Sequence, residues 1–375
     1  MLPVAWLVGV VSSLAPEAQQ CPDVRSVEIV SLVAAGEGGS AKEHGKPARA
    51  DAQGKPLGAE ACGKVASADG RRKMVKSGDT VTLGVHVKVR SGKKDLSYSA
   101  LPLGGRREAL SPESWPSSCP VQVTWYKVEA EAESYSNPGN ASPATIAYQE
   151  TKWESGWSVP ADVHPTLMHD EFPSVAHGLG VMRYKAVVSA GGREWSSPGV
   201  ECRESGAICS AVHTVAYRRD DTYIGFLYEL YNTPYIYGSK GIKGGNQADL
   251  LVGSDCADLA VYGKRRQHGR RKYEYTFTGG LCKYGKCTPV TLGSDGFYVD
   301  RKGARVPFGP SLAARPGDLL NLAGGHVGVL VSDNGNGQLD SKDLLMHTFA
   351  REPETVPISD CRWPIVSAKV VRWYR

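Results

Sequence analysis

Four segments in the first half of the chain alternate between apolar and polar residues, or stay apolar over the length of a strand. They are Ser26–Ala34, Thr80–Arg90, Val121–Ala130 and Gly180–Ser189. A period of two places successive side chains on opposite faces of a β-strand. Gly191-Gly192 adds a tight turn before residues 193–196. Because long polar loops separate these strands, we expect residues 22–205 to form an antiparallel β-sandwich of the immunoglobulin type.

The pattern changes in the second half of the chain. Apolar residues recur at helical spacing in Thr214–Tyr231, and a second helix is expected at Cys256–Lys264. Asp255 or Ser254 would cap the second helix, and Gly269 would end it. Strands are expected around Asp318–Leu322, Val327–Ser332, Leu344–Phe349 and Val366–Tyr374. Helices followed by a sheet predict an α+β domain over residues 206–375.

The first residues, MLPVAWLVGVVSSLA, form an apolar run that polar residues follow. Its length suits the core of a secretion signal and is short for a membrane span. We therefore expect residues 1–21 to be a signal peptide and the protein to be exported, to the periplasm or the outside. The alternative is a buried N-terminal strand. No later stretch is long and apolar enough to predict a membrane helix.

The chain has nine cysteines, an odd number. In an oxidising compartment, eight of them could form four disulfides and leave one free thiol. Cys202 with Cys209 and Cys282 with Cys287 are plausible local pairs. The sequence does not assign the other pairs, and Cys256 is the thiol that we expect to be free.

The formal charge is +5, and its densest basic run is Lys264–Lys272. Positive charge at the end of a helix suits the helix dipole. A nucleic-acid surface is the other reading, but no aromatic residues for base stacking accompany the run. We expect no nucleic-acid partner, and the sequence leaves attraction to an anionic wall polymer open.

Cys256 follows a capping residue, so its sulfur should lie on the first turn of a helix. Free N–H groups and the positive end of the dipole stabilise a thiolate there. The same N–H groups could receive the negative oxygen of a tetrahedral intermediate. The alternative is a structural cysteine.

Two histidines could serve this thiol. His326 follows two glycines and opens an apolar strand, which suits a general base. His347 lies on the next predicted strand, where it could hold the ring of His326 in one orientation. The alternatives are a loop histidine and a half-buried strand histidine.

Five motifs occur in one order over about 130 residues. They are Thr233–Gly238 (TPYIYG), Asp255–Leu259 (DCADL), Pro316–Leu319 (PGDL), Gly325–Val329 (GHVGV) and Met346-His347. In this, residues 211–375 resemble the NlpC/P60 family, papain-like cysteine peptidases that cut the peptide stems of bacterial cell walls. The resemblance implies Cys256 as the nucleophile, His326 as the base and His347 as the orienting residue. It also implies that Tyr235 contributes to the substrate site or the oxyanion site, and we place Asp255 beside it. Ser239 stands where the family usually has a second glycine.

Residues 332–343 resemble a calcium loop in an EF-hand-like register, with Gly337 at the sixth position. The other reading is a polar hairpin loop. The sequence has no G-x-S-x-G motif of serine hydrolases, no H-E-x-x-H zinc motif and no Walker loop. We therefore expect no cofactor and no catalytic metal.

The sequence thus predicts an exported cysteine hydrolase that cuts amide bonds in peptidoglycan stems through a thioester. Its partner would be peptidoglycan or another peptide-bearing polymer of the cell envelope. An amidase or acyltransferase of the same fold with another substrate is the first alternative. A cell-envelope binding protein without enzymatic activity is the second. The oligomeric state is left open.

Overall fold

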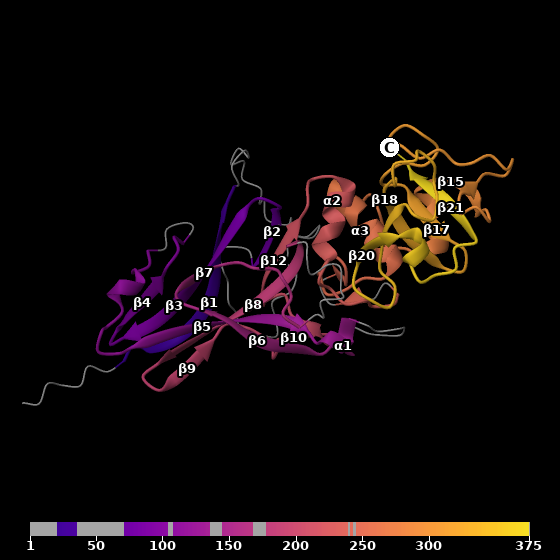
Figure 1. Cartoon of the computed structure of the whole chain (residues 1–375). Helices are drawn as coiled ribbons and strands as arrows, with labels where there is room; N and C mark the ends of the chain where they lie inside the picture. The colour runs from indigo at the N-terminus through magenta and orange to yellow at the C-terminus, as the bar shows by residue number, and fades with distance from the viewer. Residues whose placement is uncertain are drawn as a thin grey trace, which may run out of the picture.

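A computed structural model describes residues 21–35, 71–103, 108–135, 145–167, 178–238, 241–242 and 245–374. The protein is a strand-rich α+β protein with several antiparallel sheets. Figure 1 shows the strands of the first half gathered at one end of an elongated molecule, and the C-terminal sheet at the other. The helices α2 and α3 lie between them. Most of the predicted signal peptide, residues 1–20, lies outside the described residues.

Two sheets build the first half. One contains β1 (Asp23–Ala34), β3 (Thr80–Ser91), β4 (Lys94–Ser99) and β7 (Ser158–Pro160). The other contains β2 (Arg72–Lys76), β12 (His213–Arg218), β8 (Gly180–Ala190), β5 (Val121–Ala130), β6 (Tyr148–Ser155) and β9 (Arg193–Ser196). The four strands expected from the sequence are thus present as β1, β3, β5 and β8, and the Gly191-Gly192 turn joins β8 to β9.

These two sheets share one apolar core. Alternate residues of β3, from Val81 to Val89, are buried, as the period of two predicts. They belong to the same cluster as Trp125 of β5 and Tyr184 of β8. A disulfide from Cys21 to Cys119 ties the start of the first sheet to the loop before β5. Cys202 and Cys209 form the second disulfide, as expected from their spacing.

The prediction of a helix over Thr214–Tyr231 is wrong for its first third. Residues His213–Arg218 form β12, which pairs antiparallel with β8 and parallel with β2. All six residues of β12 are buried, because the strand lies inside the sheet with neighbours on both sides. Burial of both faces removes the alternation that separates a strand from a helix in sequence. The second sheet therefore continues past residue 205, where we expected the first domain to end.

Among the α-helices of the described residues, only α3 is longer than five residues. They are α1 (Ala132–Tyr135), α2 (Tyr223–Leu227) and α3 (Cys256–His268), with 3-10 turns at Pro112–Ser114, Tyr228–Leu230, Thr278–Lys283 and Ile358–Asp360. Two small hairpins pair β10 (Arg203–Glu204) with β11 (Ala207–Ile208), and β13 (Gly241–Ile242) with β14 (Gly245–Asn246).

The C-terminal half is a seven-stranded sheet in the order β16-β15-β21-β17-β18-β19-β20. Its strands are β15 (Gly285–Leu292), β16 (Tyr298–Val299), β17 (Leu319–Leu322), β18 (His326–Ser332), β19 (Leu344–His347), β20 (Glu354–Pro357) and β21 (Ser367–Trp373). The four expected strands are β17, β18, β19 and β21. Helix α3 packs on β18 and β19.

The ends of α3 follow from the sequence. The Asp255 side chain accepts a hydrogen bond from the Asp258 backbone N–H at 2.7 Å and caps the helix. At the other end, Gly269 takes a φ of +92°, and its N–H donates to the carbonyl of Arg265. The helix buries its first eight residues, so the sulfur of Cys256 is anchored by a rigid element.

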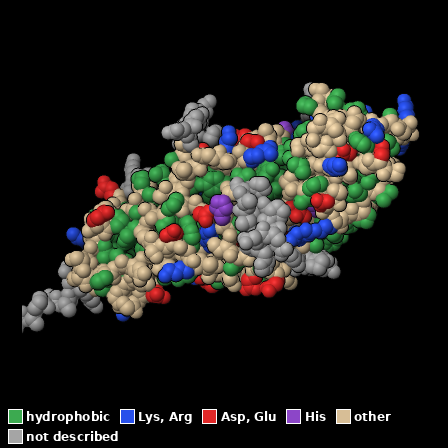
Figure 2. All heavy atoms as spheres, viewed as in Figure 1, with side chains coloured by type: hydrophobic (Ala, Val, Ile, Leu, Met, Phe, Trp, Pro, Cys, Tyr) green, Lys and Arg blue, Asp and Glu red, His purple; other side chains and the backbone are tan. Residues whose placement is uncertain are grey.

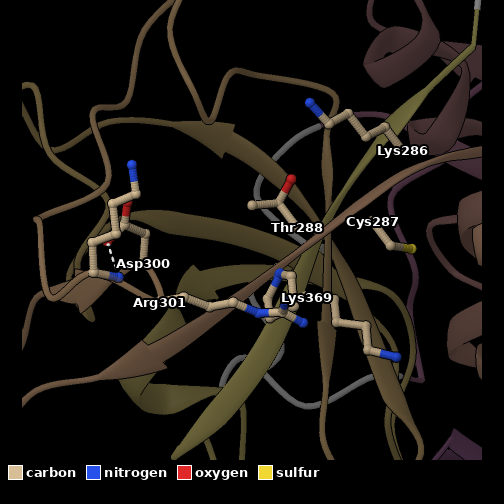
Figure 3. Close-up of a pocket in the computed structure, with 8 residues that line it drawn as sticks. Lys286, Cys287, Thr288, Asp300, Arg301 and Lys369 are labelled. Atoms are coloured by element: carbon tan, nitrogen blue, oxygen red, sulfur yellow. Dashed lines mark hydrogen bonds between the residues drawn. The ribbon is translucent and has the colours of Figure 1, made fainter.

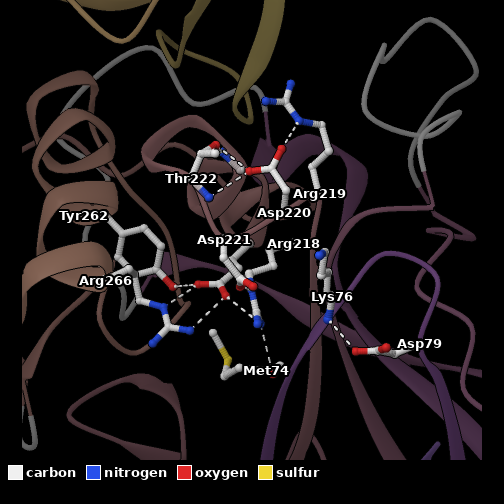
Figure 4. Close-up of polar contacts among 12 residues, drawn as sticks. Met74, Lys76, Asp79, Arg218, Arg219, Asp220, Asp221, Thr222, Tyr262 and Arg266 are labelled. Carbon is white, nitrogen blue, oxygen red and sulfur yellow. Dashed lines mark hydrogen bonds and ion pairs between the residues drawn. The ribbon is translucent and has the colours of Figure 1, made fainter. Parts of the chain in front are cut away.

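A buried carboxylate joins the two halves. Glu229, fully buried, accepts hydrogen bonds from the Tyr262 hydroxyl and from two nitrogens of Arg266. Arg218 of β12 lies 3.8 Å from the same carboxylate and also bonds the Met74 carbonyl (Figure 4). The second sheet, the turn after α2 that contains Glu229, and α3 therefore meet at one ionic cluster.

The same cluster accounts for part of the basic run. Arg266 is held by Glu229, and Arg265 forms an ion pair with the buried Asp249 at 2.6 Å. Lys264 lies over the ring of Tyr223, 4.6 Å from its centroid. These cations serve contacts inside the protein. On the face shown in Figure 2, basic and acidic side chains are interspersed.

Candidate functional site

Cys256 is the first residue of α3 and is 8% exposed. Among the described cysteines, only Cys256 and Cys361 are free thiols. Cys282 and Cys287 form the third disulfide, as their spacing predicted. Cys62 lies outside the described residues. Cys256 is thus unpaired, as a nucleophile must be.

The environment of Cys256 does not favour a resting thiolate. Burial, and next the negative charge of Asp255, raise the pKa of the thiol to about 12. The backbone N–H groups of Val327 and Ala257 lower this pKa, but they do not offset the burial. We expected the helix N-terminus to stabilise a thiolate; here desolvation is the larger effect. The thiol is therefore protonated at neutral pH.

His326 and His347 are both fully buried and contact each other. The Nε2 atom of His326 lies 3.1 Å from Nδ1 of His347. On its other side, Nε2 of His347 lies 3.5 Å from Oε1 of Glu354, and neither of these two atoms has a hydrogen-bond partner among the described residues. Glu354 is the cross-strand neighbour of His347 in the β19–β20 pair. The three side chains form a row that ends at the free Nδ1 atom of His326, which has no hydrogen-bond partner among the described residues.

Burial keeps both imidazoles uncharged. It lowers the pKa of His326 to about 4. The pKa of His347 is lowered first by burial and then by the neighbouring His326. Burial raises the pKa of Glu354, while Arg362 and Arg351 lower it. Neutral histidines at neutral pH are what a general base requires.

Residues next to the two histidines connect them to the thiol of Cys256. The Val327 N–H that interacts with the Cys256 sulfur belongs to the residue directly after His326. The ring of Phe349 lies 5.4 Å from that of His326 and 6.2 Å from that of Tyr235. Within the described residues, no hydrogen bond joins the sulfur to Nδ1 of His326. The two groups thus share one site without a resting thiol–imidazole bond.

Tyr235 and Asp255 lie beside the nucleophile, where the sequence placed them. Tyr235 bridges Ser254, and its pKa is raised by burial and then by Cys256 and Asp255. The Asp255 carboxylate is used as the helix cap. A buried Gln247 amide joins the segment of Tyr235 to α3, because it donates to the Ile236 carbonyl and to Asp258.

Sequence reasoning missed three site residues, Phe349, Glu354 and Trp363. Phe349 lies two positions after His347, in the loop that follows β19. The ring of Trp363 lies 5.4 Å from His326 and 4.9 Å from Phe349, and its N–H donates to the Ala323 carbonyl. Glu354 and Trp363 reach the site through strand pairing and a loop, which leave no local sequence signal.

The loop at 332–343 closes on itself as a polar hairpin loop between β18 and β19. The side-chain amides of Asn334 and Asn336 donate to Asp340. Asp343 accepts from the backbone N–H groups of Asn334 and Asp340. Within the described residues, no group of three or more His, Cys, Asp or Glu side chains is arranged to hold a metal ion.

An open cavity of about 540 Å³ lies at the edge of the C-terminal sheet. It is lined by Lys286, Cys287, Thr288, Pro289, Asp300, Arg301, Lys302 and Lys369 (Figure 3). None of these residues belongs to the site around Cys256. Its lysines and arginine are exposed surface groups.

Among the described residues, no helix has the length and apolar character that crossing a membrane requires. A comparison of the chain with models of protein families, with curated proteins and with solved structures finds no match.

Proposed function

We propose that this protein is a cysteine hydrolase that cleaves amide bonds, with Cys256 as nucleophile and His326 as base. The observation that carries the proposal is the combination of a free thiol at a helix start with a row of neutral histidines in the same site. The motif order that resembles the NlpC/P60 family supports it. On this view residues 211–375 are papain-like, and the two-sheet half is an accessory sandwich of immunoglobulin type.

Proton positions in the row follow from the carboxylate at its end. An ionised Glu354 only accepts, so on this proposal Nε2 of His347 carries a hydrogen and closes the 3.5 Å contact to Oε1 into a hydrogen bond when the site works. A neutral His347 then accepts at Nδ1, and His326 must donate to it from Nε2. This leaves the lone pair of His326 on Nδ1, free to take the proton of the thiol.

The reaction then starts from the uncharged thiol of Cys256 and the uncharged imidazole of His326. As the Cys256 sulfur bonds to the substrate carbonyl carbon, its proton moves to Nδ1 of His326. N–H groups at the start of α3 stabilise the oxyanion. His326 returns the proton to the leaving amine as the C–N bond breaks, which forms a thioester. Water hydrolyses the thioester, with His326 again as base.

The substrate that we propose is the peptide stem of peptidoglycan, and the protein would act outside the cytosol. Three disulfides among the described residues suit an oxidising compartment. Cys21 is bonded to Cys119, so the leader that we expect must end before Cys21. We therefore propose a signal that ends at residue 20, one residue earlier than the sequence predicted.

The test is digestion of purified cell wall, with mass spectrometry of the released fragments. The unaltered protein should release peptide fragments, and Cys256→Ala should release none while it keeps its folded circular dichroism spectrum. Cys361→Ala is the control for removal of a thiol as such, because Cys361 is the other free cysteine of the described residues. Turnover that survives in Cys256→Ala contradicts the assignment. Absence of fragments with the unaltered protein rejects the wall substrate.

A further inference from the structure

Three successive backbone carbonyls just before the nucleophile accept hydrogen bonds from the first half of the protein. Arg72 donates to the carbonyls of Asp249 and Leu250, at 2.8 and 3.2 Å. Arg183 donates to the carbonyl of Leu251 at 2.5 Å. We call this set of bonds the arginine clamp.

The second sheet places the two arginines side by side. Arg72 in β2 and Arg183 in β8 are both register partners of Thr214 in β12, one on each side of it. Side chains at aligned positions of neighbouring strands lie on the same face of a sheet. Arg183 is 5% exposed, so its guanidinium makes its bond to the Leu251 carbonyl away from water, where a hydrogen bond is stronger.

The turn that receives the clamp is unusual by itself. Leu251 is fully buried and has a φ of +58°, a left-handed conformation that residues other than glycine rarely adopt. Its N–H donates to the Ala248 carbonyl, and the next N–H, of Val252, donates to Gln247. Strain of this kind persists only where the surroundings hold it, and Arg183 bonds the carbonyl of the strained residue.

A short, tightly packed stretch links this turn to the site. A Cβ on Gly253 would lie 2.4 Å from the Ile236 side chain and 2.7 Å from the Pro234 carbonyl oxygen. Ser254 exchanges backbone hydrogen bonds with Pro234 and Ile236, on either side of Tyr235. The stretch between the clamp and Asp255 is therefore tightly packed and hydrogen-bonded, so a shift of the turn moves the start of α3.

We propose that Arg72 and Arg183 are positioning residues: the sheet of the first half sets the place of the Cys256 sulfur. The first half is then a structural part of the active site. The geometric part of this proposal concerns the position of a thiol and can be measured without turnover. Its effect on catalysis rests on the proposed function.

Arg203 provides a matched control for Arg183. Both guanidinium groups lie over the ring of Tyr148, at 5.9 Å for Arg183 and 4.9 Å for Arg203. The hydrogen bonds of Arg203 go to the carbonyls of Val200, Ile146 and Gly206, all within the first half. Arg203→Gln therefore removes a half-buried arginine that lies over the same ring and leaves the clamp intact.

The experiment measures how fast iodoacetamide labels Cys256 and Cys361 in the full-length protein, with each thiol followed by peptide mass spectrometry. In Arg183→Gln, labelling of Cys256 should rise several-fold because the sulfur leaves its buried place. Labelling of Cys361, which is fully buried in the same half, should stay unchanged. Arg203→Gln should change neither rate. Arg183→Lys, which keeps the positive charge and an N–H donor for the Leu251 carbonyl, should return the Cys256 rate toward that of the unaltered protein.

Equal labelling of Cys256 in Arg183→Gln and the unaltered protein overturns the proposal, and so does a parallel rise at both thiols. Should Arg183→Gln fail to fold, Arg72→Lys gives the same comparison with a milder loss. In the wall assay, the proposal predicts that Arg183→Gln lowers kcat about 100-fold with little change in KM. If the unaltered protein has no turnover, the function fails while the labelling result still decides the clamp.

Discussion

At the scale of single residues, the site depends on which nitrogen of His326 is free. Its Nε2 is engaged by His347, and Nδ1 has no partner among the described residues. Both histidines are neutral because burial disfavours their charged forms. In the proposed mechanism Glu354, 3.5 Å from Nε2 of His347, sets where the hydrogens of the two imidazoles lie.

Replacement of Glu354 by Gln tests this row. A glutamine amide can donate as well as accept, so it no longer fixes the hydrogen on His347. We expect kcat to fall about 10- to 100-fold with little change in KM, as for residues that orient a catalytic histidine. In a His347→Asn background, where the asparagine oxygen accepts from His326 directly, the same replacement should cost nothing. An equal loss in both backgrounds contradicts the role given to Glu354.

The pH dependence of activity follows from the same residues. The folded pKa of His326 is about 4, below its ordinary value, so the imidazole stays a base as the pH falls. We expect kcat to hold down to about pH 5, and to fall tenfold per pH unit below about pH 4. A rate profile against pH of the wall reaction measures it. An acid limb near pH 6.5 would mean that His326 is solvated in the working enzyme.

These residues differ in how far the sequence could predict them. Cys256, His326 and His347 stand in local motifs with a capping residue or a strand start beside them. Glu354 stands beside His347 only through the register of β19 and β20, and register across strands is not readable from one sequence. The high pKa of Cys256 was missed for a similar reason, because burial depends on the whole fold.

At the scale of elements, α3 shows what local sequence determines well. A capping aspartate marks its start, a glycine marks its end, and the residues of its first turns are buried. β12 shows the opposite case, because a strand buried on both faces has no alternation. Its sequence was compatible with helical spacing, and only its pairing with β8 and β2 decides the outcome.

The cap of α3 gives a prediction in which stability and reactivity separate. Asp255→Asn keeps an oxygen that can accept from the Asp258 N–H, but it removes the charge that raises the pKa of Cys256. We expect unchanged stability and faster alkylation of Cys256 at pH 8. Asp255→Ala should show the same faster alkylation together with a loss of about 1 kcal/mol in the free energy of unfolding.

Alkylation rates against pH and urea unfolding measure the two effects. An unchanged alkylation rate in Asp255→Asn would mean that burial alone sets the pKa of the thiol. Equal stability of the Asn and Ala variants would remove the cap from the account of α3.

At the scale of the whole molecule, the two halves are packed against each other. They share an apolar cluster that runs from β3 and β8 through α2 and α3 to β18. A backbone hydrogen bond from Val181 to Tyr231 and the buried Glu229 cluster cross the same junction. The sequence predicted two domains with a boundary near residue 205, and these contacts between distant segments could not be read from local patterns.

We therefore expect a single unfolding transition, with a large effect of Glu229. Glu229→Gln removes the buried carboxylate that pairs with the half-buried Arg266 and should lower the free energy of unfolding by about 1–3 kcal/mol. Urea unfolding followed by fluorescence and circular dichroism measures it. Asp295→Asn, which breaks the exposed pair with Arg305, is the control and should leave the midpoint unchanged. Two separated transitions in the unaltered protein would contradict the shared core.

The most direct measurement of the central claim is the covalent intermediate itself. Protein mixed with soluble wall peptides is quenched in acid, digested, and searched by mass spectrometry for an acyl group on the peptide that carries Cys256. We predict a thioester on Cys256 that vanishes in Cys256→Ala, and that His326→Ala does not form. Release of the same products at the same rate by Cys256→Ala, or an acyl group on another side chain, would contradict the account.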